Sequence, residues 1–182
     1  MQEVYYGELQ HGHMEQVGYE MYCKLLDEVV KEMTGEQVEE EVDVQIDLNV
    51  TSYIPDELIE NSSQKIEVYQ NIALCKSEEE ILDITDEIVD RYGRITEEVE
   101  NLLNIARIKI LAREKHLIKI SQKNNNIIFY FDATKFNSEK IDNLIKIYKN
   151  RIKFSPAQEP YVTLKIDNNK ILDSVKEFLN NL

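Results

Sequence analysis

Four acidic residues within one short stretch are the first candidates for chemistry in this 182-residue chain. They follow the spacing i, i+3, i+4 and i+7 that lines one side of an α-helix: Asp83, Asp86, Glu87 and Asp90. Paired carboxylates of this kind can supply the acid and base of a glycosidase, keep a helix soluble, or dock on a basic partner. We expect no residue nearby in sequence to neutralise this acidic stripe. Its pattern favours a solvated face or a docking surface over catalysis.

Other residues that often carry chemistry are sparse and poorly placed. His11 and His13 have no cysteine or acid at a spacing that would complete a metal site, and His116 is expected at a helix end, where it complements the dipole. None of the five glycines stands in a G-x-x-x-x-G-K-[ST] or G-x-G-x-x-G pattern, so no phosphate-binding loop is expected. We therefore expect no catalytic residue, cofactor or metal in this chain, and no enzyme activity, ATP hydrolysis included.

Charge divides the chain into two parts. Residues 1–100 hold 27 acidic and 6 basic residues, a net charge of −21, whereas residues 101–182 hold 8 acidic and 15 basic residues, a net charge of +7. Acidic surfaces repel nucleic acid, so we expect no direct nucleic-acid binding, and the dispersed lysines of the second part are typical of a solvated face. The chain has neither an apolar run of membrane-spanning length nor a secretory pattern at its start. We expect a cytoplasmic protein without membrane contact.

The hydrophobic pattern predicts an α+β fold whose first part is mostly helical with one early strand. Alternation of Val42, Val44, Ile46 and Leu48 indicates a strand with one buried face, and Pro55 is expected to open a short turn after it. Cys23 and Cys75 fall on apolar helix faces and are expected to be buried and reduced. The helices of this part are predicted over 17–33, 63–76, 77–92 and 96–116.

The helix predicted over 77–92 carries the acidic stripe and has clear end signals. Ser77 and Glu80 have the spacing of a capping box, and Gly93 follows the last helical residue. The side opposite the stripe is predicted to face the core: Ile81, Ile84, Ile88 and Tyr92. Leu82 and Val89 flank that apolar side. The next helix is expected to bury Val99, Leu102, Leu103, Ala106 and Ile110.

The second part of the chain is predicted to be ββαββα. Two apolar runs, 117–121 and 127–132, flank the segment KNNN, and asparagines in such a turn tolerate positive φ. The two apolar runs should form a β-hairpin. The remaining elements are expected as a helix at 138–149, strands at 151–155 and 161–166, and a helix at 170–179.

Four short motifs occur in one order along the centre of the chain. They are YIPD at 53–56, the spaced set Ile66, Tyr69, Ile72 and Ala73, DRYG at 90–93, and LLNIARIK at 102–109. Together they resemble the C-terminal domain of the bacterial transcription-repair coupling factor (Mfd) family. The segment GELQHGHMEQVGYEMYCKLLDEVV is similar to the tail of that family's translocation module. The resemblance implies such a tail and a linking helix at 1–35 and a C-terminal regulatory (TRCF) domain at 36–182; residues 121–182 match no motif closely.

The resemblance also implies a function. The family's members are large ATP-driven DNA translocases that displace stalled RNA polymerase and recruit the excision-repair protein UvrA. ATP and Mg²⁺ belong to the motor, which this chain lacks, so we expect a C-terminal piece of such a protein. In the family this domain docks on a UvrB-like module and masks its UvrA-binding surface, through positions that here are Glu87 and Asp90. The alternative is an independent acidic adaptor that binds a basic site on RNA polymerase or mimics DNA.

Overall fold

The structure, a computed structural model, describes all residues except 1–28, 30–32, 34–42 and 168. The helix predicted over 17–33 and the thiol of Cys23 therefore lie outside the described residues, apart from residues 29 and 33. The order of helices and strands is that of an α+β protein, as the sequence predicts.

The chain divides into two compact units. The first, which we call the helical unit, includes residues 51–106; the second, the sheet unit, includes residues 43–50 and 107–182. The boundary expected at 35/36 falls outside the described residues and stays a prediction.

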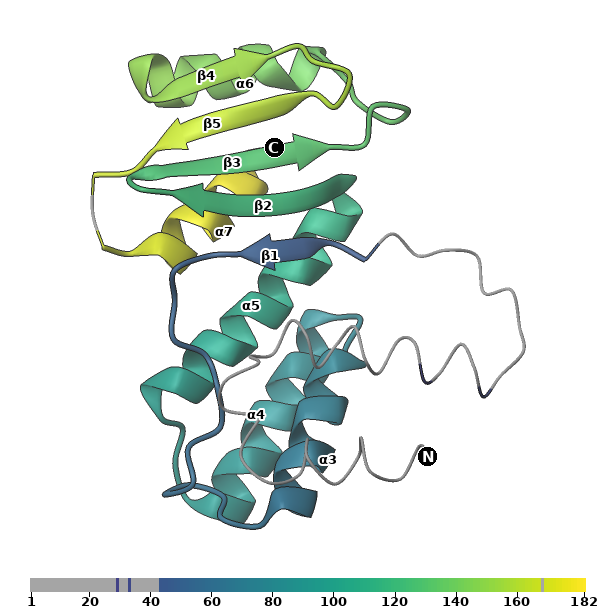
Figure 1. The fold of residues 1–182 in the computed structure, drawn as a ribbon, viewed down its shortest axis with the longest axis vertical. Coiled ribbons are helices and arrows are strands. Elements are labelled where there is room, and N and C mark those ends of the chain that lie inside the picture. Colours follow the sequence, from purple (N-terminus) through teal and green to yellow (C-terminus); the bar gives the residue numbers. More distant parts are fainter. Residues whose placement is uncertain (1–28, 30–32, 34–42, 168) are drawn as a thin grey trace, which may run out of the picture. The chain divides into compact units, whose positions relative to one another are not determined.

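The helical unit contains α3 (Ser62–Ala73), α4 (Glu78–Tyr92) and the first part of α5 (Glu97–Glu114) (Figure 1). The turn predicted at Pro55 is present, because the Pro55 carbonyl accepts hydrogen bonds from the amides of Leu58 and Ile59, at 3.0 and 3.1 Å. α3 begins after Asn61, whose side chain accepts from the amide of Gln64, and it ends three residues earlier than the sequence predicts.

The core of the helical unit is aliphatic and is tied to the preceding loop by polar contacts. The Tyr69 hydroxyl accepts a 2.8 Å hydrogen bond from the amide of Ile54, and the buried Lys65 ammonium pairs with Asp56. These contacts satisfy polar groups that would otherwise be costly to bury. The buried side chains include Ile54, Ile59, Val68, Ile72, Ile81, Ile88, Val99, Leu102, Leu103 and Ala106.

The sheet unit is built on five strands in the order β1-β2-β3-β5-β4. The strands are β1 (Gln45–Asp47), β2 (Leu117–Lys123), β3 (Asn126–Phe131), β4 (Ile152–Ser155) and β5 (Tyr161–Lys165). β1 runs parallel to β2, and the other neighbours are antiparallel. The predicted early strand therefore completes the sheet of the second part, a pairing that the sequence alone did not indicate.

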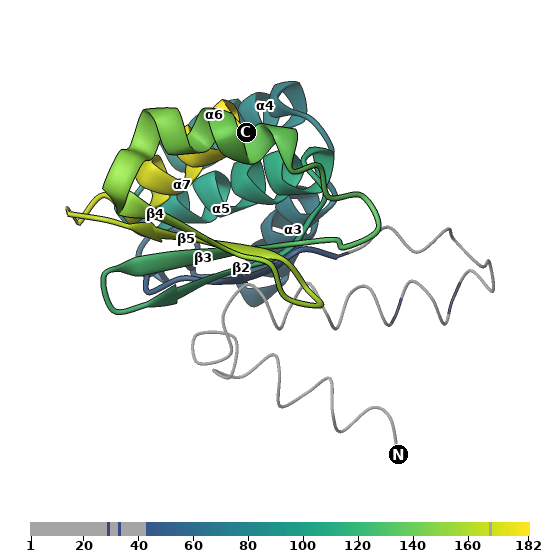
Figure 2. The same cartoon turned by 90° about the horizontal axis from the view of Figure 1, so that it is seen from above.

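Helices cover one face of this sheet. α6 (Glu139–Tyr148), α7 (Ile171–Asn181) and the end of α5 lie on the same side of it (Figure 2). The inward side chains alternate along each strand, as Ile127, Phe129 and Phe131 do on β3, and the Phe129 ring stacks on Phe178 of α7 at 3.8 Å. The predicted β-hairpin is confirmed, and Asn124 in its turn adopts a φ of 53°.

α5 differs from its prediction in one respect. Ile110 is only half-buried, whereas Ile108 and Ala112 are fully buried. The helix is shared between the two units, with the division after Ala106, so one stripe cannot serve as the apolar face along its whole length. The expectation that Ile110 continues the stripe begun by Val99 is wrong for this reason. No helix in the described ranges combines the length and apolarity that a membrane span needs.

Candidate functional site

The acidic stripe lies on α4, whose two ends are fixed by local hydrogen bonds. The Ser77 hydroxyl accepts from the amide of Glu80 at 3.3 Å, and the Glu80 carboxylate accepts from the amide of Lys76 at 2.6 Å. At the other end Gly93 adopts a φ of 84°, and its amide donates to the Val89 carbonyl at 2.8 Å. The predicted cap at Ser77 and stop at Gly93 are both confirmed. These ends hold the stripe on a regular helix of 15 residues.

The two sides of α4 differ sharply in burial. Ile81 and Ile88 are buried in the helical unit, and Ile84 and Tyr92 are half-buried beside them. All four acids of the stripe are exposed to solvent. The structure therefore brings Asp83, Asp86, Glu87 and Asp90 together on the outer side of the helix, as their spacing predicts.

One member of the stripe has a basic partner within the chain. Arg91 Nη1 donates to Glu87 Oε1 at 3.2 Å and lies 3.7 Å from Glu67 Oε1 on α3. The hydrogen bond that Arg91 donates to Glu87 is the main cause that raises the pKa of the Arg91 guanidinium. The expectation that nothing nearby neutralises the stripe is thus wrong for Glu87. Its partner stands at i+4, a spacing at which opposite charges meet on a helix.

The other three acids have no basic partner in the part of the chain that the structure describes. Among the residues that the structure describes, none forms an ion pair or a hydrogen bond with the side chain of Asp83, Asp86 or Asp90. Next to them, Leu82 and Val89 are exposed by 50% and 40%. An apolar pair bordered by unpaired carboxylates can contact a partner that offers both an apolar surface and basic side chains. The sequence placed these two residues beside the core and did not predict how far they are exposed.

Cys75 is buried, as predicted, but it lies in the loop between α3 and α4, because α3 ends at Ala73, and not on the helix face that was expected. Its thiol donates to the Asn71 carbonyl at 3.2 Å. Burial raises the pKa of the thiol to about 11, and the charges of Glu80 and Asp83 add to this shift. Because the thiolate is the reactive form, this cysteine is a poor nucleophile and a structural residue.

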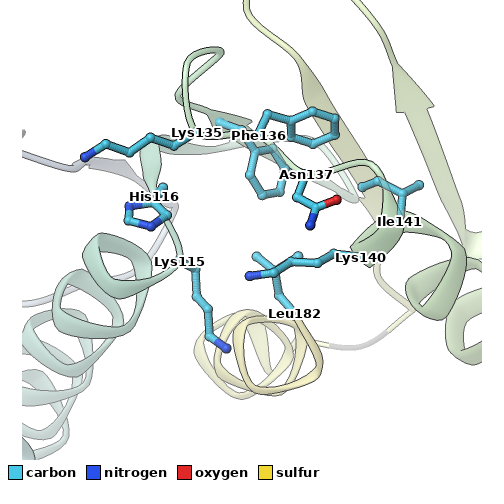
Figure 3. Close-up of a pocket in the computed structure, with 9 residues that line it drawn as sticks. Lys115, His116, Lys135, Phe136, Asn137, Lys140, Ile141 and Leu182 are labelled. Atoms are coloured by element: carbon cyan, nitrogen blue, oxygen red, sulfur yellow. The ribbon is translucent and has the colours of Figure 1, made fainter.

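A small hollow in the sheet unit is lined by several basic side chains. It spans about 310 Å³, a volume that includes open solvent, and its labelled side chains come from the turn after α5, the loop before α6, the start of α6 and the residue after α7 (Figure 3). His116, Lys115, Lys135 and Lys140 line it, and no carboxylate side chain does. No group of three metal-ligating side chains occurs among the described residues.

Comparison with known proteins identifies the family. A model of the TRCF domain matches residues 48–143, which is more than half of the chain and includes all of α4. The chain belongs to the TRCF domain family. The motifs on which the resemblance was based between YIPD and LLNIARIK lie within the matched range.

Three relatives show how much of a protein this TRCF domain represents. The transcription-repair-coupling factor of Helicobacter pylori is 34% identical over 134 residues, which cover 74% of this chain and 13% of that protein. The factor of Borreliella burgdorferi is 28% identical over 97% of this chain and 16% of its own length. That of Staphylococcus haemolyticus is 37% identical over 66% of this chain and 10% of its own length. The chain spans a sixth or less of these relatives.

A solved structure shares the fold. The crystal structure of the C-terminal domain of transcription-repair coupling factor superposes with a TM-score of 0.67, covers 77% of this chain and 91% of that one, and is 18% identical in sequence. With the family match, this chain corresponds to the C-terminal TRCF domain of transcription-repair-coupling factors, which implies a DNA-repair context.

Proposed function

We propose that this TRCF domain is an autoinhibitory, protein-binding domain whose α4 docks on a basic surface of a UvrB-like module in the same protein. Docking would mask the surface that recruits UvrA. The parent would be an ATP-dependent DNA translocase that displaces stalled RNA polymerase, with ATP and Mg²⁺ held by its motor. The observation that carries the proposal is the row of exposed acids at Asp83, Asp86 and Asp90, which have no ionic partner among the described residues and lie within the matched TRCF range.

The electrostatics of α4 support docking more than simple solubility. Like charges three and four residues apart destabilise a helix by a few tenths of a kcal/mol per pair, so the stripe lowers the stability of α4 in the free chain. A basic partner would convert that repulsion into attraction. Arg91 already does so for Glu87. The Arg91 guanidinium contacts the carboxylates of both Glu87 and Glu67. Asp86 and Asp90 are therefore more available to a partner than Glu87 is.

A tethered domain can act as a switch with a modest contact. Joined modules experience effective concentrations of about 1 mM, so a contact with a Kd of about 10 μM keeps roughly 99% of molecules closed. Loss of about 2.7 kcal/mol would raise that Kd about 100-fold and leave roughly half of them open. Motor movement that pulls the modules apart would have the same effect.

The direct test is binding in trans between this chain and the separately expressed UvrB-like module of the same protein. We expect a complex that weakens as salt rises, because exposed charge pairs are screened. Asp86→Lys with Asp90→Lys should weaken it at least about 30-fold. The matched control is Glu57→Lys with Glu60→Lys, which makes the same charge change at exposed sites outside α4. Equal loss in both variants would show that only net charge matters and would refute a docking role for α4.

A further inference from the structure

The sheet has a second face that carries a pattern of its own. Helices α6 and α7 lie on one side only (Figure 2), and the side chains of the opposite side are exposed or half-buried rather than buried. We call this the outer sheet face. Cross-strand pairing sets its members side by side: Lys119, Ser121 and Lys123 of β2, Asn126, Ile128 and Tyr130 of β3, Lys153 and Ser155 of β4, and Tyr161, Thr163 and Lys165 of β5.

Two tyrosines lie side by side at one end of this face. Tyr130 pairs directly with Tyr161 on the neighbouring strand, and their ring centroids are 5.5 Å apart with planes tilted by 40°. Lys119 pairs with Tyr130 from the other side, and its ammonium lies 5.7 Å from the ring centroid. Both rings are half-exposed. A partner of the right shape can therefore lie against an aromatic surface that already tolerates a cation beside it.

Further lysines lie on the same face, in the next two cross-strand rows. Lys153 pairs with Thr163, two residues along β5 from Tyr161, and Lys165 pairs with Asn126 at the end of the β2–β3 hairpin near Lys123. No described acid forms an ion pair with Lys123, Lys153 or Lys165. Residues two apart on a β-strand are separated by about 6.6 Å. The rows that hold Tyr161, Lys153 and Lys165 are therefore spaced much as successive phosphates are in an extended nucleic-acid strand. The acid that shares this face is Asp47 of the edge strand β1, opposite Ser121.

We propose that the outer sheet face binds single-stranded nucleic acid, with bases stacked on Tyr130 and Tyr161 and phosphates beside Lys119, Lys153 and Lys165. Aromatic rings set among cations on an open sheet are the combination that such strands require, because every base has a face that stacks. A duplex hides those base faces, and an acidic peptide would leave the rings unused. The expectation of no nucleic-acid binding rested on the net charge of residues 1–100; the proposal revises it for single strands only.

The test measures fluorescence anisotropy of a labelled 12-nucleotide oligothymidine with the whole chain. We expect micromolar binding at about 50 mM salt, and a log–log salt slope of about −2, since Lys119, Lys153 and Lys165 each release roughly 0.7 counterion. A duplex of the same length should bind at least about tenfold more weakly. A glutamate-rich peptide of equal charge should not compete.

Variants separate stacking from charge. Tyr130→Ala with Tyr161→Ala should weaken binding at least about tenfold, whereas Tyr130→Phe with Tyr161→Phe should retain it, because phenylalanine stacks without a hydroxyl. Lys153→Ala with Lys165→Ala should make the salt slope shallower by about 1.4. Lys140→Ala with Lys146→Ala, at exposed sites on α6, is the matched control and should leave the slope unchanged.

Several results would overturn the proposal. They are the absence of binding at low salt, full competition by the glutamate peptide, and a folded alanine variant that binds as tightly as the unmodified chain. If the alanine pair does not fold, as judged by circular dichroism, the lysine variants decide: equal salt slopes for the Lys153/Lys165 and Lys140/Lys146 pairs would exclude the outer sheet face as the binding surface.

Discussion

Reversing two charges on α4, Glu87→Lys with Asp90→Lys, should leave the stability of the chain almost unchanged. Glu87 loses an exposed i,i+4 pair with Arg91, worth about 0.3–0.5 kcal/mol, and the new lysine repels that arginine by a similar amount. Asp90→Lys removes repulsion with Asp86 and adds a base in the last turns of the helix, where it gains about 0.3–1 kcal/mol from the dipole. The two contributions oppose each other, so the net change should lie within about 1 kcal/mol.

The same variant should have a much larger effect on docking. Removing one partner from a close, desolvated charge pair costs roughly 2–5 kcal/mol, which corresponds to about 30- to 5000-fold in Kd. For two such positions the loss should exceed the roughly 100-fold margin that keeps a tethered domain closed. The ratio between a small stability change and a large binding change distinguishes a docking surface from a solvated one.

Urea unfolding followed by circular dichroism measures the first quantity, and titration with the UvrB-like module measures the second. The Glu57→Lys and Glu60→Lys pair controls for net charge in both. A drop in unfolding free energy above about 2 kcal/mol would show that these acids hold the helical unit together. In that case the reasoning from exposed positions on α4 would be wrong, whatever the binding result.

Three further predictions concern other parts of the chain. Because the pKa of the Cys75 thiol is raised to about 11 from 9.0, thiol labelling of the native chain should be much slower than labelling of the unfolded chain, and rapid native labelling would contradict the burial of Cys75. The free energy of unfolding should also fall as pH rises from about 9 to 11, because the thiol ionises more readily in the unfolded chain. Gly93→Ala should lower the unfolding free energy by about 1 kcal/mol, since a φ of 84° is strained for alanine although a Cβ would meet no atom; an unchanged urea midpoint would exclude this strain. Duplex DNA should bind no tighter than about millimolar at physiological salt, and a micromolar shift in gel mobility would show that the basic part of the chain outweighs the acidic one.

Much of the local structure follows from the sequence because its signals are short-range. The cap at Ser77, the stop at Gly93 and the asparagine turn at Asn124 all depend on residues within a few positions, and each is present as predicted. The stripe on α4 also follows from periodicity, since one regular helix fixes which side chains share a side.

Long-range arrangement was harder to predict. The pairing of β1 with β2 joins segments about 70 residues apart, and no local pattern specifies which strand an early strand will meet. The burial of Ile108 and Ala112 in place of Ile110 depends on the division of α5 between two units. The pair between Arg91 and Glu87 could have been found, because i,i+4 spacing predicts it. The contact between Arg91 and Glu67 needed the packing of α3 against α4.

Whether α4 holds the parent protein closed is measured most directly by capture of UvrA by the full-length protein in the absence of DNA and RNA polymerase. We expect the protein carrying Glu87→Lys and Asp90→Lys to be captured, whereas the unmodified protein and the Glu57→Lys, Glu60→Lys control are not. If the folded α4 variant stays as closed to UvrA as the unmodified protein, the acidic stripe is a solvated face and the account is wrong.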